Sequence, residues 1–314
     1  MKILFLDEVH PVLEERLVEA GFTCIQAADF SKEMCLNAVT NSDGIVIRSR
    51  FKMDAEFLDA AKQLKFIARS GAGMENIDVS YCEQNGITLF NAPEGNRNAV
   101  GEHALGMLLS LMNHLSSADQ DVRSGKWDRE GNRGEELDRK TVGIIGFGNN
   151  GNSFAKKLRG FDCRVLAYDK YKTNFGNEQV QEVYLDKLVK ESDVISFHIP
   201  QNEETIYFAN DNFFNSIQKP IYLLNLSRGR IVHTASLVNA LKSGKVKAAG
   251  LDVLEYEKSS FESFFDQELP SDFEYLLNAK NVLLTPHVGG WTTESYFKLS
   301  NVLADKILEK FAIK

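Results

Sequence analysis

Short apolar runs alternate with longer amphipathic stretches along almost the whole chain. Such runs are typical of strands buried in a parallel sheet, and amphipathic stretches are typical of the helices that cover its faces. In the first part of the chain, strands are expected at residues 2–6, 22–25, 44–47, 66–69 and 87–90, with helices between them at 11–20 and 55–61. The pattern therefore predicts the α/β class.

A long helix is expected next, at residues 98–124. Its apolar positions cover much of its circumference, which indicates burial on more than one side. Such a helix can connect two domains or meet a second subunit. The polar, glycine-rich stretch 123–134 that follows is typical of a connecting loop.

A second alternating series begins at Thr141. Its strands are expected at residues 142–145, 165–168, 194–198, 222–226, 248–252 and 282–284, and a helix at 292–311 follows them. Segment 258–281 mixes phenylalanines with acidic residues and gives no clear assignment. The two series predict two doubly wound parallel-sheet domains, with an active site in the cleft between them, at the carboxyl ends of the strands.

The composition narrows the class of protein. The 314 residues include 36 lysines and arginines and 44 acidic residues, a formal charge of −8, which argues against nucleic acid as the main partner. The first residues turn acidic too early for a signal peptide, and no apolar run approaches the roughly 18 residues of a membrane span. The four cysteines are far apart and form no CxxC pair, so we expect reduced thiols, a cytoplasmic protein and no metal site.

The strand expected at 142–145 leads into a glycine-rich turn formed by Gly146, Phe147, Gly148, Asn149, Asn150 and Gly151. The first glycine of a GxGxxG turn permits the tight turn, the second lets the backbone approach a pyrophosphate, and the third lets helix and strand pack closely. The helix that follows offers N–H groups and a partial positive charge to the phosphates. A tight turn without a ligand is the alternative. The sequence therefore predicts a dinucleotide site.

Asp169 ends the next expected strand. A carboxylate at this point accepts hydrogen bonds from both ribose hydroxyls and repels a 2′-phosphate. NAD is therefore predicted in preference to NADP, although Lys170 and Lys172 nearby weaken that choice.

Four segments of the chain resemble the D-isomer-specific 2-hydroxyacid dehydrogenases, and the resemblance runs nearly end to end. They are residues 142–151, 225–232, 249–257 and 285–290. The resemblance implies a flavodoxin-like substrate-binding domain at 1–97 plus 288–314 and a Rossmann NAD-binding domain at 98–287. Closure of the two domains is expected to exclude water before hydride transfer.

Three residues match the family's catalytic arginine, glutamate and histidine: Arg228, Glu257 and His287. A histidine that titrates near neutrality can pass a proton to or from the substrate oxygen. Glu257, if it is hydrogen-bonded to His287, would orient the ring and favour the imidazolium. Arg228 can hold the substrate carboxylate with two hydrogen bonds and polarise the neighbouring carbonyl. A structural loop histidine, a surface carboxylate and a surface arginine are the alternatives.

The resemblance also implies further cofactor contacts, from His198, Ile199, Pro200, Thr205, Asp252 and Gly289. Asp252 matches a residue near the nicotinamide amide, whereas His198 could equally be a core histidine at a strand end. Two positions depart from the family pattern. Lys258 stands where a proline usually follows Glu257, and Asn150 stands where relatives usually carry an apolar residue, so the packing of helix on strand is expected to differ there.

The substrate-binding loop of the family resembles the stretch Arg69, Ser70, Gly71, Ala72 and Gly73, whose backbone N–H groups can bind a carboxylate. Arg48, Arg69 and either Arg129 or Arg133 match positions where phosphoglycerate dehydrogenases hold a phosphate. We therefore expect oxidation of 3-phosphoglycerate to 3-phosphohydroxypyruvate, the first step toward serine. Arginines that are solvated or paired with acidic residues are the alternative.

Two other functions stay open. One is a broad 2-ketoacid reductase acting on glyoxylate, hydroxypyruvate or D-lactate. The other is a dinucleotide-sensing corepressor, for which a docking extension would be expected, and the sequence shows none. The absence of a regulatory domain after the helix at 292–311 predicts that serine does not inhibit through such a domain. The helix at 98–124 is expected to support a homodimer.

Overall fold

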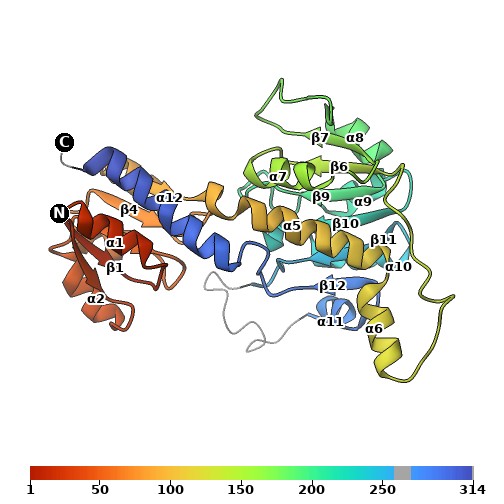
Figure 1. Ribbon diagram of the computed structural model, residues 1–314, viewed down its shortest axis with the longest axis horizontal. Coiled ribbons are helices and arrows are strands. Elements are labelled where there is room, and N and C mark those ends of the chain that lie inside the picture. The colour runs from red at the N-terminus through yellow and green to blue at the C-terminus, as the bar shows by residue number, and fades with distance from the viewer. Residues whose placement is uncertain (258–269, 313–314) are drawn as a thin grey trace. The chain divides into compact units, whose positions relative to one another are not determined.

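The computed structural model describes residues 1–257 and 270–312. The chain divides into two compact units, Met1–Arg97 with the segment from Trp291 onward, and Asn98–Glu257 with the segment that ends at Gly290. Each unit contains one parallel sheet with helices on its faces (Figure 1). The predicted α/β class with two doubly wound sheets is therefore confirmed.

The sheet of the first unit has the order β2-β1-β3-β4-β5, the flavodoxin-like order. Its strands are β1 Lys2–Phe5, β2 Thr23–Gln26, β3 Gly44–Ile47, β4 Phe66–Arg69 and β5 Thr88–Asn91. The helices of this unit are α1 Val12–Glu19, α2 Lys32–Val39, α3 Ala55–Ala60, α4 Val79–Gln84 and α12 Thr293–Phe311. All ten elements except α2 and α4 had been expected to within a few residues, since strands and long amphipathic helices have strong local patterns.

Alternation along β1 divides the core of the first unit into two layers. Ile3 and Phe5 face the helices α1 and α12, in a cluster that includes Leu303. Leu4 and Leu6 face the opposite side, which α2, α3 and α4 cover. Successive strand side chains point to opposite faces, so a strand buried on both sides must be apolar throughout.

The sheet of the second unit has the order β12-β11-β10-β9-β6-β7-β8. Counted within the unit, this is the Rossmann order with one additional strand beside its last member. The strands are β6 Thr141–Ile145, β7 Arg164–Tyr168, β8 Val180–Glu182, β9 Val194–Phe197, β10 Ile221–Asn225, β11 Val246–Leu251 and β12 Val282–Leu284. The helical elements are α5 Pro93–Met112, α6 Leu115–Arg123, α7 Asn149–Lys157, α8 Leu185–Glu191, α9 Asp211–Ser216, η1 Gly229–Ile231, α10 Thr234–Lys242 and α11 Ser271–Asn278.

The single helix expected at 98–124 is wrong. The chain forms α5 and α6 instead, separated by His114, whose φ of 52° lies in the left-handed region. The carbonyl of Met112 accepts a hydrogen bond from the amide of Glu135 at 2.8 Å, so it does not continue the helical series. The break between α5 and α6 depends on a segment more than twenty residues away. A local apolar pattern carries no information about such a distant contact.

The strand β8 and the helix α11 were among the elements that the sequence did not predict. The short edge strand β8 has only three residues, too few for a recognisable pattern. The final helix does begin as expected, because Thr292 accepts from the amide of Ser295 in a capping box. Part of segment 258–281 forms α11, and residues 258–269 lie outside the described residues.

All four cysteines are free, as the sequence predicted. Burial raises the pKa of Cys24 and of Cys82 to about 11, which keeps both thiols protonated and weakly nucleophilic near neutral pH. Of the helices in the described part of the chain, none is both long enough and apolar enough to cross a membrane.

Candidate active site

The predicted site residues of the second unit follow the carboxyl ends of its strands. Arg228, Glu257 and His287 come after β10, β11 and β12, which are three neighbours in the sheet. The dinucleotide turn comes after β6, Asp169 after β7 and His198 after β9. Because all strands are parallel, these loops share one edge of the sheet, which is the edge where doubly wound folds bind ligands.

The glycine turn has the geometry that a pyrophosphate requires. Gly146 has a φ of 94°, and a Cβ there would lie 2.6 Å from the carbonyl oxygen of His198. A Cβ on Gly151 would lie 2.1 Å from the carbonyl oxygen of Gly146, so only glycine lets α7 pack this closely on the turn. Gly148, the residue before α7, has no atom within 4 Å of such a Cβ, which leaves its backbone open to a ligand.

Asp169 is held by backbone amides. Its Oδ2 accepts from the amide of Phe147 at 2.8 Å, and its Oδ1 accepts from Tyr171 and Lys172 at 2.9 and 3.0 Å. These bonds tie the end of β7 to the glycine turn after β6. Each carboxylate oxygen can accept further hydrogen bonds. The backbone amides therefore orient the Asp169 carboxylate and still leave it able to bind the ribose hydroxyls.

The two lysines beside Asp169 have partners of their own. The ammonium of Lys170 is ion-paired with Glu204, and the Nζ of Lys172 lies 3.4 Å from the carbonyl oxygen of Phe147. Neither cation is therefore left as a dedicated site for a 2′-phosphate. This arrangement supports the choice of NAD that Asp169 suggested.

His198 is a buried imidazole beside the glycine turn, although the residue as a whole is partly exposed. Its Nε2 lies 2.8 Å from the hydroxyl of Ser196, and its ring packs on Phe154 with 5.6 Å between centroids. Its Nδ1 is buried and has no hydrogen-bond partner among the described residues, and the Oδ1 of Asn150 is in the same state. Thr205 closes the loop after β9, since its hydroxyl donates to the carbonyl of Pro200 at 2.7 Å.

Burial lowers the pKa of His198 from 6.5 to about 4, which predicts an acid-labile fold. Between pH 6.5 and 4 the unfolded chain binds a proton that the folded chain excludes, so stability falls as the pH drops through this window. The contribution lost by pH 5 is about 2 kcal/mol. Urea unfolding at pH 7 and pH 5 checks this, with His198→Gln as the variant whose stability should change less. Equal losses in both proteins would contradict the assignment.

Glu257 and His287 form a pair across 30 residues of chain. The Nδ1 of His287 lies 2.8 Å from the Oε2 of Glu257. A carboxylate only accepts hydrogen bonds, so Nδ1 of His287 carries the proton in this pair. His287 has a φ of 55°, and its amide donates to the carbonyl oxygen of Asp252 at 2.8 Å. The sequence predicted this pair, and the geometry brings it together.

Asp252 supports the loop that carries His287. The carboxylate is buried and accepts from the hydroxyl of Thr285 at 2.6 Å and from the amides of Val288 and Gly289 at 2.9 and 2.8 Å. The Nε2 of His103, on α5, lies 3.1 Å from the Thr285 hydroxyl. Sequence reasoning placed Asp252 and Gly289 near the cofactor and missed the contribution of His103, because α5 gives no local signal for a contact with β12.

Arg228 lies on a turn that Asn225 braces. Asn225 is fully buried, donates to the carbonyl oxygen of Arg228 at 2.9 Å and accepts from the hydroxyl of Ser227 at 2.8 Å. The guanidinium of Arg228 donates to the carbonyl of Ser227 at 2.6 Å. Asn225 has no role that the sequence alone predicts, although an amide side chain directly before a turn is a common turn-stabilising residue.

The predicted substrate loop of the first unit is ordered around Arg69. Its guanidinium donates to the carbonyl of Arg48 at 3.1 Å and lies so close to Gly71 that a Cβ there would be 1.6 Å from Nη1. Ser70 donates its amide to Ile47, and Gly71 donates to Arg69. Among the described residues, the amides of Ala72 and Gly73 have no acceptor. These two N–H groups remain available for an anion.

The other predicted phosphate ligands differ from one another. The guanidinium of Arg48 stacks over the ring of Trp291 at 4.2 Å, and its nearest acceptor is the carbonyl oxygen of Glu8 at 3.5 Å. Arg133 is exposed and ion-paired with Glu130 at 2.7 Å. Arg129 is exposed on the same loop of the second unit.

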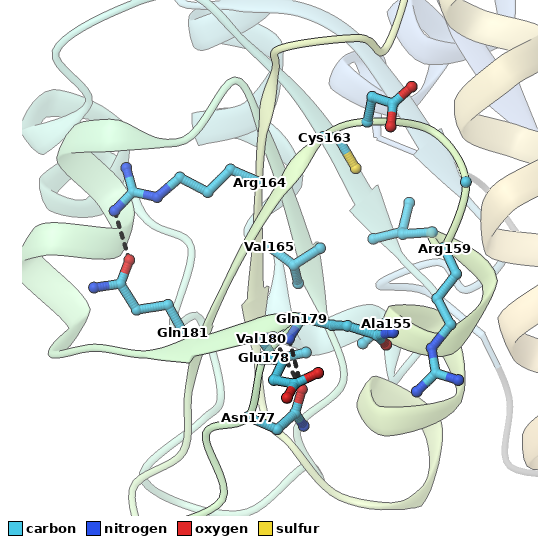
Figure 2. Close-up of a pocket in the computed structure, with 13 residues that line it drawn as sticks. Ala155, Arg159, Cys163, Arg164, Val165, Asn177, Glu178, Gln179, Val180 and Gln181 are labelled. Carbon is cyan, nitrogen blue, oxygen red and sulfur yellow. Dashed lines mark hydrogen bonds between the residues drawn. The ribbon is translucent and has the colours of Figure 1, made fainter.

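A hollow of about 460 Å³ lies elsewhere on the second unit (Figure 2). Its lining includes Arg159 just after α7, Arg164 at the start of β7 and the strand β8. Figure 2 shows Arg164 turned toward Gln181, to which it donates at 2.7 Å. The hollow is at the amino end of β7, so it is not the site formed by the glycine turn and Asp169.

Comparisons with known proteins identify the class. A family profile described as "D-isomer specific 2-hydroxyacid dehydrogenase, NAD binding domain" matches residues 105–289. The chain belongs to this family, whose members are NAD-dependent oxidoreductases that act on a CH–OH group. The match covers β6 to β12 and every cofactor residue named above.

The individual relatives are named for different substrates. The chain is 36% identical over 310 residues to a D-3-phosphoglycerate dehydrogenase of Archaeoglobus fulgidus, covering 98% of this chain and 57% of the relative. It is 35% identical over 289 residues to a hydroxypyruvate reductase of Thermotoga maritima, covering 92% and 91%. A D-lactate dehydrogenase of Aquifex aeolicus, solved with NAD and lactic acid, aligns at 27% identity with a TM-score of 0.83, over 99% and 96% of the two chains. The chain thus spans little more than half of the first relative and most of the second.

NAD fits the residues that are present. The crowding at Gly146 and Gly151 and the open backbone at Gly148 form the cradle that a pyrophosphate needs, and Asp169 is oriented for the ribose. The family match and the NAD-bound relative agree with this fit. NAD is therefore the cofactor, as the sequence predicted.

Proposed function

We propose that the protein interconverts a D-2-hydroxy acid and its 2-keto acid, with Arg228, Glu257 and His287 as the catalytic residues. The observation that carries this proposal is the 2.8 Å bond between His287 and Glu257, in loops at the same sheet edge as the dinucleotide turn. An alcohol oxidation needs a hydride acceptor and a proton acceptor together. The NAD that binds at the glycine turn is the hydride acceptor, and the imidazole of His287 is the proton acceptor.

Each of the three catalytic residues has its own role in this reaction. Bound NAD supplies the hydride acceptor for the carbon that carries the hydroxyl. His287 takes the hydroxyl proton on Nε2, and Glu257 stabilises the imidazolium through Nδ1. Arg228 holds the substrate carboxylate, because a guanidinium matches a carboxylate with two charge-assisted hydrogen bonds. In the reverse direction His287 returns the proton to the carbonyl oxygen.

The substrate we favour is 3-phosphoglycerate, and the reason is the arginines of the first unit. Arg48 has no carboxylate partner among the described residues, and Arg69 is fixed next to the amides of Ala72 and Gly73. A plain hydroxy acid has one carboxylate, which Arg228 can bind. Additional cations and free amides suit a second anion, and a phosphate carries nearly two charges. The name of the Archaeoglobus relative points the same way.

Steady-state kinetics with 3-phosphoglycerate and unphosphorylated D-glycerate tests the substrate. We expect kcat/KM for 3-phosphoglycerate to be at least tenfold higher, since one charged hydrogen bond to the phosphate contributes about 1.5–3 kcal/mol. Arg48→Gln should remove most of that preference and leave D-glycerate turnover within about twofold. Equal kcat/KM for both substrates in the unaltered protein would rule out a phosphate site.

A reductase of hydroxypyruvate, glyoxylate or D-lactate type is the second candidate. Arg133, one of the predicted phosphate ligands, is already paired with Glu130, which reduces the number of cations free for a phosphate. The hydroxypyruvate reductase of Thermotoga maritima matches this chain over most of its own length. A panel of 2-keto acids followed by NADH absorbance separates the two candidates.

The cofactor preference depends on Asp169. We expect Asp169→Ser to weaken NADH binding by about tenfold, because two hydrogen bonds to the ribose are lost while repulsion of a 2′-phosphate also disappears. The ratio of NADH to NADPH affinity, measured by fluorescence titration, should therefore fall. Glu191→Gln is the matched control, since this carboxylate is paired with Arg164 at the start of β7, away from the glycine turn. An unchanged ratio in Asp169→Ser would refute the assignment.

We further propose that a second copy of this chain covers α6. None of its residues is buried, and Leu115 and Val122 are each 56% exposed. Trp127, shortly after α6, is 81% exposed. Large apolar side chains gathered on one helix and the adjoining loop indicate an interface, and symmetric dimers are the commonest assembly. Sedimentation velocity should show a dimer at micromolar concentration, and a monomer there would refute the proposal.

A further inference from the structure

The loop that carries His287 depends on one buried residue, Asp252, whose side chain is only 3% exposed. The backbone carbonyl of Asp252 accepts from the amide of His287 at 2.8 Å. Its carboxylate accepts from the next two amides, those of Val288 and Gly289, at 2.9 and 2.8 Å. A Cβ on Gly289 would lie 2.8 Å from Oδ2, so any larger residue would push the carboxylate aside. Three successive amides of the loop are therefore placed by Asp252.

Asp252 also connects this loop to the turn of Arg228. Its amide donates to the carbonyl oxygen of Asn225 at 3.0 Å, and the side chain of Asn225 donates to the carbonyl oxygen of Arg228 at 2.9 Å. Asn225 ends β10 and Asp252 follows β11, its neighbour in the sheet. A shift of Asp252 would therefore move the loop of His287 relative to the turn of Arg228.

Two hydrogen bonds in series join the Asp252 carboxylate to the helix α5. The hydroxyl oxygen of Thr285 lies 2.6 Å from Oδ1 of Asp252, and the Nε2 of His103 lies 3.1 Å from the same hydroxyl. A carboxylate only accepts, so the single hydroxyl proton of Thr285 is donated to Asp252. The hydroxyl can then only accept from His103, and Nε2 of His103 must carry a proton. Both bonds therefore point from α5 toward the carboxylate.

This direction of donation strengthens the contacts of the carboxylate. A hydroxyl that accepts one hydrogen bond donates a stronger one, because successive bonds in a chain polarise each other. The Nε2 of His103 also lies 3.6 Å from Oδ1 of Asp252, so its N–H dipole favours the negative charge there. A buried carboxylate is costly unless its oxygens are hydrogen-bonded, and each lost donor leaves it less well satisfied.

We propose that His103 is a positioning residue, which fixes the Thr285 hydroxyl and, through it, the Asp252 carboxylate and the loop of His287. His103 acts through two other side chains. Its effect on turnover rests on the proposed function, but its effect on the loop can be measured without turnover. Without the Nε2 donor, the Thr285 hydroxyl is free to rotate away from Asp252, and the carboxylate holds the loop amides less firmly.

The kinetic test compares three substitutions of His103 in the full chain, with NADH and a 2-keto acid. His103→Leu removes the donor and should lower kcat about three- to tenfold, with KM for NADH within about twofold, as expected for part of one hydrogen bond in a charged network. His103→Gln places an N–H the same number of bonds from Cβ and should restore kcat to within about twofold. His103→Asn, whose amide is one bond shorter, is the matched control and should resemble His103→Leu.

A double-mutant cycle tests whether the effect passes through Thr285. Thr285→Val removes the hydroxyl and nearly keeps the shape of the side chain. In this background His103→Leu should cause no further loss of kcat, since no hydroxyl remains to be oriented. Thr285→Ser keeps the hydroxyl, so the loss caused by His103→Leu should persist in that background.

Nuclear magnetic resonance tests the hydrogen bonds directly. In protein labelled with ¹⁵N-histidine, at about pH 8.5 and so above the usual titration range of imidazoles, the ring of His103 should carry its proton on Nε2. The amides of Val288 and Gly289 should exchange with deuterated solvent at least about threefold faster in His103→Leu, and His103→Gln should restore their protection. If His103→Leu does not fold, His103→Asn takes its place, because it keeps a polar side chain on α5.

These measurements separate the positioning role from the proposed function. The positioning role would be overturned by a His103 ring protonated on Nδ1, by unchanged exchange of the two loop amides, or by equal losses of kcat from His103→Leu with and without the Thr285 hydroxyl. If the unaltered protein turns over none of the 2-keto acids, the proposed function fails. The tautomer and the exchange rates still decide whether His103 positions the loop.

Discussion

Replacing His287 with asparagine is expected to lower kcat by about 100- to 10,000-fold, the usual contribution of a positioned general acid or base. Asparagine is the suitable substitution because the φ of 55° at this position is in the left-handed region, where asparagine is tolerated and alanine is strained. Without the imidazole, no group bonded to Glu257 can exchange a proton with the substrate oxygen. Affinity for NADH, measured by fluorescence titration, should stay within about twofold, since the glycine turn and Asp169 are untouched.

The chain offers a matched control for this substitution. His114 has a φ of 52°, so His114→Asn places the same side chain on the same kind of backbone, away from the carboxyl edge of the sheet. We expect His114→Asn to retain kcat within about twofold. A His287→Asn variant with near-normal kcat would refute the catalytic assignment, and loss of NADH binding along with kcat would indicate that the loop had collapsed instead.

The second large effect is expected at Arg228. Arg228→Gln should reduce kcat/KM for any 2-hydroxy acid by about 100- to 10,000-fold, because two charge-assisted hydrogen bonds to the substrate carboxylate are lost at about 1.5–3 kcal/mol each. Asn225 and the Ser227 carbonyl already fix the turn and the guanidinium, so little of this loss should come from a disordered turn. Steady-state kinetics should show a lower kcat and a higher KM.

Arg164→Gln is the control for this variant. Arg164 begins β7 at the opposite edge of the sheet, where it is ion-paired with Glu191 at 2.6 Å. It should change kcat/KM by less than about twofold. Arg228→Gln would contradict the assignment if it bound substrate as tightly as the unaltered protein, and thermal unfolding of both variants checks that each is folded.

The site residues were predicted from the sequence on two different grounds, local backbone constraints and family motifs. Gly146, Gly151 and Asp169 were predictable because their constraints are local, a turn and the end of the next strand. Arg228, Glu257 and His287 were found through motifs, and each follows a strand whose apolar run is clear. The roles of those three residues and of the first-unit arginines remain predictions for the experiments above.

Other parts of the site could not be predicted from the sequence. Asp252 was assigned to the cofactor, and its carboxylate also organises the loop of His287 through three internal hydrogen bonds. The contact of His103 with Thr285 gave no sequence signal, since it joins positions 182 residues apart. The break between α5 and α6 was missed for the same reason, because the acceptor of the Glu135 amide is a carbonyl of a distant helix residue.

The sequence by itself determined the α/β class, the positions of most strands, the dinucleotide turn and the family to which the chain belongs. These features depend on periodicity and on glycines whose conformational need is local. Only the tertiary structure decided which tautomer His287 adopts, how the Glu257 carboxylate is held and where the long helix ends. Each of those depends on a hydrogen bond between residues far apart in the chain, and such a bond exists only after the sheet has brought its carboxyl edge together.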